Sequence, residues 1–354
     1  MASINTSSSL PLRFRRLDFS QVPWEELDRF ADRTVFQTRE WIRFIAETQN
    51  ATPVVAELRE GDAVLGYFTG LTFRRLGIRI LGSSFPGWTT PYIGFNLRPG
   101  VPRRLALEAL EHFAFRELKC LHMEISDRNF SVEDGAQLGF AVGSYDSYAT
   151  DLTRPEEELF QNMESAARRC IRKAEKSGVK IEEAGDEVFA DEYYAQLQEV
   201  FAKQGLVPTY PLERVRKLVH HLLPTGRLLL LRARDAENNC IGTGIYPGYN
   251  KVAEFWGNAS WRKYQQLRPN ETLHWYAIRY WKRRGAEVFD WGGGGTYKEK
   301  YGVQPISVPW FRKSRYAWLD AARQHARTLF DIKHRMLGKL RGGAQRVEKP
   351  EAEE

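Results

Sequence analysis

The sequence predicts an α/β protein made of two similar units in tandem, followed by a basic C-terminal helix. Its 354 residues are more than one hydrophobic core usually serves. Gly66 and Gly242, each in a strand that follows a turn, are 176 residues apart. Glu124 and Asp290, each near the end of a closing strand, are 166 residues apart. Two landmarks at similar offsets indicate a duplicated unit rather than two unrelated domains.

The first expected unit covers residues 12–150. Within it, Trp41, Phe44 and Ile45 recur at helical spacing. The expected helices are 22–31, 36–49 and 104–118, and the expected strands are 52–61, 62–73, 78–85, 120–126 and 140–153, with a long loop over 86–104.

The second expected unit covers residues 151–320 and repeats this order. Pro155 lies in the first turn of its opening helix and Gly178 lies past the end of that helix. The expected helices are 155–178, 187–205, 212–223 and 269–285; the expected strands are 179–185, three strands within 226–259, and 286–293. In both units we therefore expect a mixed central sheet flanked by helices.

Residues 321–354 differ in composition from both units. Within 329–341, apolar residues could line one side of a helix whose other side carries lysine and arginine. Such a helix usually docks on its own domain. Peripheral contact with an anionic membrane is the alternative interpretation.

Charge and cysteine content limit the setting. The net charge of +7 and pI near 9.2 favour anionic partners. Cys120, Cys170 and Cys240 are far apart and fit neither a disulfide framework nor a metal site, which agrees with a reducing compartment. The N-terminus has no apolar leader and no stretch reaches the length of a membrane span. We expect a cytoplasmic protein, with peripheral contact at the inner face of the membrane as the alternative.

Several kinds of active site are absent from the sequence. It contains no G-x-S-x-G nucleophile elbow, no G-x-x-x-x-G-K-[ST] phosphate loop and no H-E-x-x-H zinc helix. The seven histidines are scattered. We therefore expect no metal centre and no permanently bound cofactor.

Two segments carry a specific resemblance. DLTRPEEELFQNMESAARRCIRKAEKSGVKIEE (residues 151–183) contains R-x-x-I-R-K-A-x-K-x-G-V, and FDWGGGGTYKEKYG (residues 289–302) is similar to Y-D-x-G-G … F-K-x-x-F-G, with a shorter spacing. Both resemble Fem-type transferases, which build peptidoglycan cross-bridges. They equally resemble Fem-related GNAT acetyltransferases found with envelope polysaccharide genes. The resemblance covers residues 12–320 and implies two tandem GNAT-like units, the second of them catalytic.

The resemblance points to Lys298 as the catalytic cation, because Tyr297, Lys298, Tyr301 and Gly302 match F-K-x-x-F-G. In the family this lysine is proposed to stabilise the reacting carbonyl, and a positioned cation does stabilise a tetrahedral oxyanion. Lys300 is a second candidate. Both lysines could instead be solvated surface charges.

Asp290 and the four glycines that follow Trp291 are further candidates. Asp290 could orient the lysine or accept a proton from the incoming amine, and it could equally cap a turn. The glycines would let the backbone approach a ligand closely and expose N–H groups, unless they only form a loose turn. These candidates are Gly292, Gly293, Gly294 and Gly295.

The acceptor candidates lie elsewhere in the sequence. The resemblance implies that Arg172 and Lys173 face a substrate such as a diphosphate; a solvated face paired with acidic neighbours is the alternative. Trp88 and Tyr92, in the loop where the family binds its acceptor, could stack on a sugar or base, or simply pack that proline-rich loop.

The donor stays open between acyl-CoA and aminoacyl-tRNA. GNAT domains that use coenzyme A usually carry R/Q-x-x-G-x-G/A before their main helix, where the helix N-terminus receives the pyrophosphate. Residues 264–275, YQQLRPNETLHW, lack these glycines. Fem-type members lack them too and use aminoacyl-tRNA, although some carry a long helical arm that this chain does not have.

We therefore expect an N-acyltransferase that moves an acetyl or aminoacyl group to an amine acceptor in cell-envelope or polysaccharide biosynthesis. A sugar-nucleotide or lipid-linked glycan precursor is the expected acceptor, with tRNA as a further partner if it carries the donor group. The alternatives are an aminoacyl-tRNA-dependent enzyme that builds peptidoglycan bridges, and a catalytically degenerate GNAT-fold binding scaffold.

Overall fold

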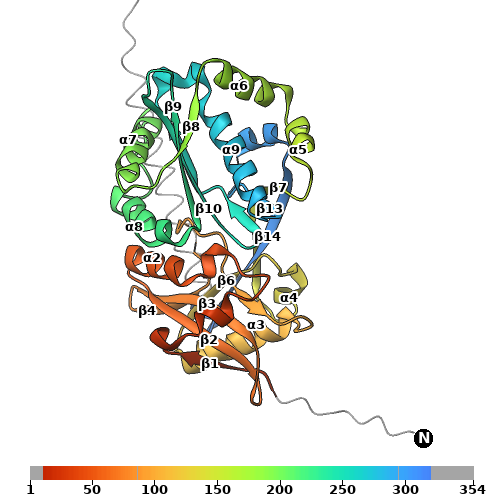
Figure 1. The fold of residues 1–354 in the computed structure, drawn as a ribbon. Helices are drawn as coiled ribbons and strands as arrows, with labels where there is room; N and C mark the ends of the chain where they lie inside the picture. Colours follow the sequence, from red (N-terminus) through yellow and green to blue (C-terminus); the bar gives the residue numbers. More distant parts are fainter. Residues whose placement is uncertain (1–10, 86, 294, 320–354) are drawn as a thin grey trace, which may run out of the picture.

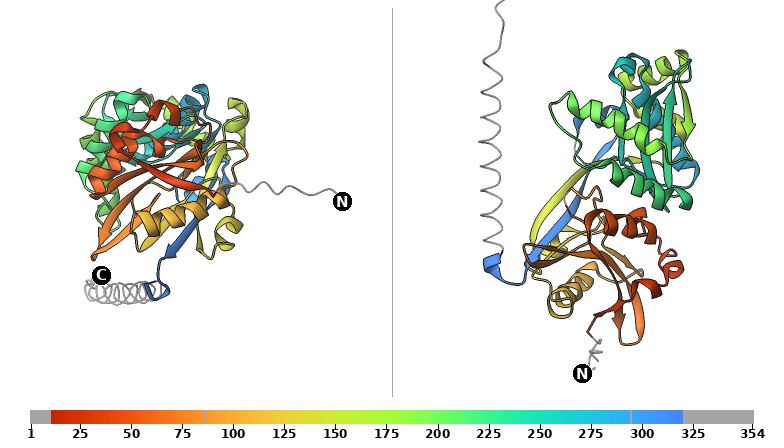
Figure 2. Two further views of the ribbon diagram at one scale, coloured as in Figure 1. Left: turned by 90° about the horizontal axis from the view of Figure 1, so that it is seen from below. Right: turned by 90° about the vertical axis from the view of Figure 1, so that its left-hand side faces the viewer.

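The computed structural model describes residues 11–85, 87–293 and 295–319, and Figure 1 shows their arrangement as two stacked halves. The described strands form one continuous mixed sheet in the order β1-β2-β3-β4-β6-β14-β7-β13-β11-β10-β9-β8, with β5 paired to β3 and β12 paired to β10. Helices flank this sheet in both halves (Figures 1 and 2). The predicted α/β fold with mixed sheets between helices is confirmed.

The bounds of the elements are as follows. The strands are β1 (Arg13–Leu17), β2 (Thr52–Glu60), β3 (Ala63–Arg75), β4 (Ile78–Gly82), β5 (Phe95–Leu97), β6 (His122–Ser126), β7 (Ala141–Asp151), β8 (Lys180–Glu183), β9 (Leu228–Arg234), β10 (Cys240–Tyr249), β11 (Val252–Glu254), β12 (Gly257–Ser260), β13 (Val288–Asp290) and β14 (Gln304–Ser314). The helices are α1 (Trp24–Leu27), α2 (Arg39–Gln49), α3 (Arg103–His112), α4 (Val132–Ala136), α5 (Glu156–Asn162), α6 (Ser165–Lys176), α7 (Phe189–Ala202), α8 (Leu212–Leu222) and α9 (Pro269–Arg283). Short helical turns include η6 (Thr296–Tyr301).

The two halves share one strand topology. In the first half β3 lies between β2 and β4 and also pairs with β5, and β4 runs parallel to β6. In the second half β10 pairs with β9, β11 and β12, and β11 runs parallel to β13. The landmark glycines are equivalent: Gly66 pairs with Leu97 on β5 and Gly242 pairs with Ser260 on β12.

Two strands belong to both halves. β7 pairs with β13 of the second half and with β14, while β14 continues onto β6 of the first half. The predicted boundary at residues 150–151 stays a prediction, because β7 spans it and the sheet is continuous there. The sequence analysis missed β14 and the short strands β1 and β5, and it expected three strands where the structure has the four strands β9 to β12.

The helix expected over residues 155–178 is two helices, so that prediction was wrong in detail. Met163 adopts an extended backbone (ψ 149°) and separates α5 from α6. The interruption lets the backbone N–H of Glu164 donate to Lys300 O at 2.9 Å. The start of α6 is thereby attached to η6, beside the glycine run.

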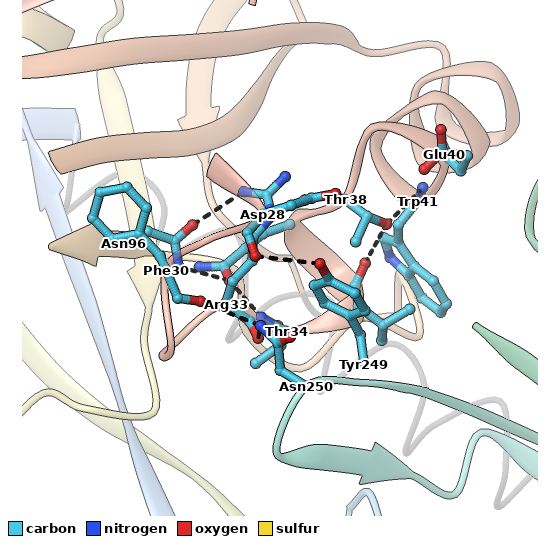
Figure 3. A network of polar contacts seen from close by, with 12 residues as sticks. Asp28, Phe30, Arg33, Thr34, Thr38, Glu40, Trp41, Asn96, Tyr249 and Asn250 are labelled. Atoms are coloured by element: carbon cyan, nitrogen blue, oxygen red, sulfur yellow. Dashed lines mark hydrogen bonds and ion pairs between the residues drawn. The ribbon is translucent and has the colours of Figure 1, made fainter. Parts of the chain in front are cut away.

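A polar network joins the halves at the turn between β10 and β11 (Figure 3). Tyr249 Oη donates to Asp28 O at 3.3 Å, and Asn250 Nδ2 donates to Arg33 O at 3.1 Å. The Asp28 carboxylate pairs with Arg33 of its own half and with Arg227 of the other half, at 2.7 and 2.8 Å. These contacts fix the first half against the hairpin that carries β11.

Within the described ranges, no helix is long and apolar enough to cross a bilayer. The segment 329–341, expected to form an amphipathic helix, lies outside the described residues.

Candidate functional site

A cavity of about 480 Å³ lies between the two halves. Its walls come from the loop after β4, from β6, β7 and β14, and from the region that follows β11 and β13. The lining residues are Ser84, Phe85, Gly87, Thr89, Thr90, Pro91, Ser126, Ser144, Tyr145, Glu254, Phe255, Trp256, Gly292, Gly293 and Trp310. Among these described lining residues, Glu254 has the only ionisable carboxylate and no side chain is a lysine or arginine. The cavity is therefore aromatic and hydroxyl-rich, with one acidic group.

Two buried carboxylates lie side by side where parallel strands end. Glu254 ends β11, Asp290 ends β13, and the two residues are partners in the parallel register. Beyond Glu254 the chain no longer pairs with β13, because the next strand, β12, pairs with β10. Space is therefore left at the carboxyl ends of β11 and β13, which is where ligands bind in open α/β sheets. Asp290 is fully buried and Glu254 nearly so.

Tyr92 connects these carboxylates to the first half. Its hydroxyl lies 3.3 Å from Glu254 Oε2 and 3.2 Å from Asp290 Oδ2. Asp290 Oδ1 also accepts from Ser147 Oγ at 2.7 Å and from the Gly292 N–H at 3.0 Å. Tyr92 is buried, so it does not offer its ring to a sugar in the way that the sequence suggested.

The environment raises the pKa of Glu254 well above its ordinary value. Burial is the main cause, and the neighbouring Asp290 charge adds to it, while Arg128, Tyr92 and Lys298 act in the opposite direction. The Arg128 guanidinium lies 5.3 Å from the Tyr92 ring centre. A carboxyl group with a raised pKa and an opening to a cavity is suited to exchange protons near neutral pH.

The glycine run forms a compact turn held by Lys298. Gly292 and Gly293 have φ of 57° and 61°, a left-handed region that favours glycine. Lys298 is 4% exposed, and its Nζ donates to Trp291 O at 2.7 Å, to Gly293 O at 3.0 Å and to Gly292 O. Burial lowers the pKa of Lys298 to about 8, although Asp290 and Glu254 counteract part of that shift.

Within its described residues, the glycine run offers few free backbone N–H groups to a ligand. The N–H of Gly292 is used by Asp290, so this amide is not available to a ligand. Gly295 precedes η6 with an extended backbone (φ 165°). Gly294 lies outside the described residues.

The other predicted site residues lie outside the cavity lining. Lys300 pairs with Glu271 at 2.8 Å, in the first turn of α9. Arg172 and Lys173 are exposed on α6, which Figure 1 places at the far end of the second half, and Arg172 lies over the Phe160 ring. Trp88 packs against Phe73 and Phe85. The structure thus brings together Tyr92, Asp290, the glycine turn and Lys298, whereas Arg172 and Lys173 do not line the cavity.

Sequence reasoning missed Glu254, Arg128, Ser147 and Tyr145. A signal existed for Glu254, because VAEFW places one acidic residue inside an apolar strand, and an unpaired buried charge is costly unless it serves a purpose. The other three occur in ordinary surroundings and gave no signal.

The first half lacks an equivalent of this acid. In its parallel strand pair Gly82 is the partner of Glu124, as Glu254 is the partner of Asp290. A Cβ on Gly82 would lie 1.9 Å from the Phe85 ring. The equivalent position in the first half is therefore filled by Phe85, which in turn lines the cavity.

No group of three or more His, Cys, Asp or Glu side chains within the described ranges is placed to hold a metal ion.

Comparisons with known proteins agree with this architecture. Residues 161–301 match the family model described as an acetyltransferase (GNAT) domain. The chain is similar to the crystal structure of FemX, with a TM-score of 0.67 and 12% identity over 84% of this chain and 96% of that chain. It is also similar to a conserved protein of unknown function from Bacteroides thetaiotaomicron VPI-5482, with a TM-score of 0.53 and 11% identity over 85% and 99% of the two chains. No curated protein gives a significant sequence match.

Proposed function

We propose that this Fem-like GNAT acyltransferase moves an acetyl or aminoacyl group onto a primary amine bound in the cavity between its halves. The observation that carries the proposal is Glu254. It lies in the segment that matches the GNAT domain, ends a parallel strand, opens into the cavity and has a raised pKa. This half is the catalytic one in our proposal, because the equivalent position of the first half is Gly82.

The proposed reaction begins with proton removal from the acceptor. An amine arrives mainly as an ammonium ion, and the Glu254 carboxylate takes one of its protons. The nitrogen lone pair then attacks the acyl carbon and a C–N bond forms. The C–S bond of a thioester, or the C–O bond of an ester, breaks as the tetrahedral intermediate collapses. The nitrogen of the tetrahedral intermediate still carries a surplus proton, which passes to the departing thiolate or alkoxide as the amide forms. The proton held by Glu254 is released to solvent, and the carboxylate is ready for the next acceptor.

Asp290 and Tyr92 position the base. Asp290 accepts three hydrogen bonds from Tyr92, Ser147 and the Gly292 amide, which lock its orientation beside Glu254. Its negative charge is one of the causes that raise the pKa of Glu254. In the proposal Asp290 is thus a positioning residue and Glu254 is the group that meets the substrate.

Lys298 is proposed to stabilise the oxyanion from behind the glycine turn. Its ammonium group shares its protons among three carbonyl oxygens of residues 291–293. If the ammonium group gave up its hydrogen bond to one of these carbonyl oxygens and donated to the oxyanion in its place, all three of its N–H groups would still have an acceptor. A buried cation acts strongly on charge that develops near it.

The chemistry of the cavity favours an amine on an uncharged arm. Phe85, Trp256 and Trp310 offer apolar surfaces on which a sugar or alkyl chain can pack. No lysine or arginine belongs to the described lining, so the phosphates of a sugar-nucleotide or lipid-linked glycan would remain outside. An amino sugar of envelope or polysaccharide biosynthesis, modified on the cytoplasmic side, fits these features.

The donor is proposed to be acyl-CoA, the usual co-substrate of GNAT domains, bound in an atypical way. The N-terminus of α9, where a pyrophosphate would be expected, carries Glu271 paired with Lys300. An aminoacyl-tRNA donor is the second candidate, because its recognition does not require that helix end.

The test is an assay of purified protein with acetyl-CoA or aminoacyl-tRNA and a panel of amino sugars and lysine-containing peptides, read by mass spectrometry. Acyl transfer to an amine that is lost in Glu254→Gln supports the proposal. Transfer by Glu254→Gln at the wild-type rate would contradict it. Folding of the variant is checked by circular dichroism.

A further inference from the structure

The edge of the first half where β3 turns into β4 carries an unusual set of exposed side chains. Leu76 is 96% exposed at the tip of this hairpin, with a left-handed backbone (φ 50°). Arg74 and Arg75 precede it and are exposed. Its neighbour Gly77 completes the turn. A leucine presented in this way gains nothing from the fold of its own half.

The end of β14 reaches the same edge. In the sheet Ile80 is the partner of His122, and His122 is the partner of Ser314. The backbone N–H of Leu121 donates to Arg79 O, and that of Arg315 donates to Leu121 O, both at 2.9 Å. Residues 79, 121 and 315 therefore form a row across three strands, about 10 Å wide at the usual spacing between strands.

The chain beyond Ser314 adds aromatic surface to this edge. Tyr316 is 44% and Trp318 is 65% exposed, and their rings are stacked with centres 6.4 Å apart. Figure 2 shows the segment after β14 at the same end of the first half as the β3–β4 hairpin. We define the edge patch by its apolar members Leu76, Tyr316 and Trp318 and its basic members Arg74, Arg75, Arg79, Arg116, Lys119 and Arg315.

We propose that the edge patch docks on an anionic membrane surface. Tyrosine and tryptophan favour the boundary between lipid and water, and exposed leucine gains by entering it. Six basic residues belong to the same edge; of these, Arg79 and Arg315 are half-buried and donate to Leu118 O and Phe115 O. Each lysine or arginine near an anionic surface adds attraction. Glu117, which lies between Arg116 and Lys119 in sequence, is acidic and exposed. Its Oε1 lies 4.0 Å from His112 Nδ1.

The sequence that follows the edge patch also favours an anionic membrane as the partner. The described structure ends at residue 319, directly after the edge patch. The sequence that follows includes residues 329–341, in which apolar residues could line one side of a helix and lysine and arginine the other. The patch and this segment are therefore joined within about ten residues.

Docking would orient the proposed catalytic cavity toward lipid-linked substrates. β4 runs from the hairpin tip to Gly82, and the next residues form the cavity wall. Five strand residues span roughly 17 Å. A head group that projects from the bilayer could bridge that distance, while a free soluble acceptor would gain nothing from docking.

The experiment measures co-sedimentation of the full chain with vesicles of phosphatidylcholine alone and with 30% phosphatidylglycerol (roughly one lipid in three, enough to give a negative surface). The wild type is expected to bind the anionic vesicles and to lose binding at high salt. Leu76→Ser with Trp318→Ser should bind at least tenfold more weakly, and so should Arg74→Gln with Arg75→Gln. Val132→Ser is the matched control, since Val132 is 52% exposed on α4, which follows the opposite end of β6.

Each other outcome would overturn the docking proposal. Equal binding by the patch variants would mean that another segment carries the contact. Equal loss with Val132→Ser would mean a nonspecific effect. A wild-type dimer in vesicle-free buffer that the patch variants abolish, without vesicle binding, would assign the surface to a second copy. The acyl-transfer assay with soluble acceptors is independent of these results, so failure of docking and failure of the proposed function can be told apart.

Discussion

The hydroxyl of Tyr92 stands between two buried carboxylates of the other half, 3.3 Å from Glu254 Oε2 and 3.2 Å from Asp290 Oδ2. One side chain of the first half thus takes part in setting the proton affinity of the proposed base in the second half. The relationship explains why the loop over residues 84–93 and the ends of β11 and β13 have to be held together.

Replacement of this tyrosine should shift the pH profile. The Tyr92 hydrogen bond lowers the pKa of Glu254, in opposition to burial. In Tyr92→Phe this pKa therefore rises further, and Glu254 becomes protonated at a higher pH. We expect the acid limb of kcat/KM to move upward. Tyr148→Phe is the control, because the Tyr148 hydroxyl donates to Glu299 at the surface. An unchanged limb in Tyr92→Phe would exclude this role.

Removal of the Glu254 charge should stabilise the protein while it reduces the rate. The pKa of Glu254 is raised in the folded state, so the folded state binds this proton more tightly than the unfolded chain does. The contribution to stability is full below the unfolded pKa and is lost as pH rises through the folded pKa. At pH 8 Glu254→Gln should therefore melt higher than wild type, at about 2–4 °C per kcal/mol.

The kinetic effect of the same variant should be at least 10²-fold on kcat, since that is the usual contribution of a general base. Asp290→Asn is the contrasting variant. It places an amide among the donors Ser147, Tyr92 and Gly292, and we expect it to lower the melting temperature. Thermal unfolding followed by circular dichroism measures both changes. A lower melting temperature for Glu254→Gln at pH 8 would refute the raised pKa of Glu254 in the folded state.

Deprotonation of Lys298 should make kcat fall at alkaline pH, which gives the pH profile an alkaline limb. Its pKa is lowered to about 8, so the ammonium loses its proton as pH rises through that value. The neutral amine can no longer serve three carbonyl oxygens, and activity should fall. We expect Lys298→Met to lose roughly 10²–10³-fold in kcat and to lack the limb. Lys300→Met, which breaks the pair with Glu271, should keep the limb.

The packing of Phe85 on Gly82 should control the size of the cavity. A Cβ at residue 82 would lie 1.9 Å from this ring, so Gly82→Ala must displace Phe85. Because Phe85 lines the cavity, its displacement changes the space available to the acceptor. We expect KM for the acceptor to rise tenfold or more with a smaller change in kcat. The double variant with Phe85→Leu should recover much of the loss. Gly185→Ala is the control, since nothing lies within 4 Å of its Cβ. An unchanged KM in Gly82→Ala would refute this packing role.

Local patterns predicted the repeated architecture well, and the comparisons confirm both the GNAT domain and the Fem-like fold. Periodicity identified most of the helices and strands that form the two cores, because each buries one regular face. It missed β14, since PISVPWF carries two prolines that argue against a central strand. Both lie in the part of β14 that pairs with β7 alone, because pairing with β6 begins at Trp310. Only the tertiary arrangement shows that strand.

The site was predictable where a motif existed and hidden where partners come from distant segments. FDWGGGG and YKEKYG pointed to the strand end, the turn and Lys298. Nothing in the sequence links Tyr92 to Glu254, 162 residues away. The prediction that Lys298 and Asp290 are catalytic stays a prediction, and the assays above examine it.

The position of β14 has a consequence for biosynthesis on the ribosome. β6 of the first half pairs with β4 on one side and with residues 310–314 on the other. That second partner is made almost two hundred residues after β6. During synthesis one edge of the nascent first half therefore stays open, and open strand edges invite wrong pairing. We expect the chain to mature only after β14 leaves the exit tunnel, so a nascent chain stopped before residue 304 should depend on chaperones.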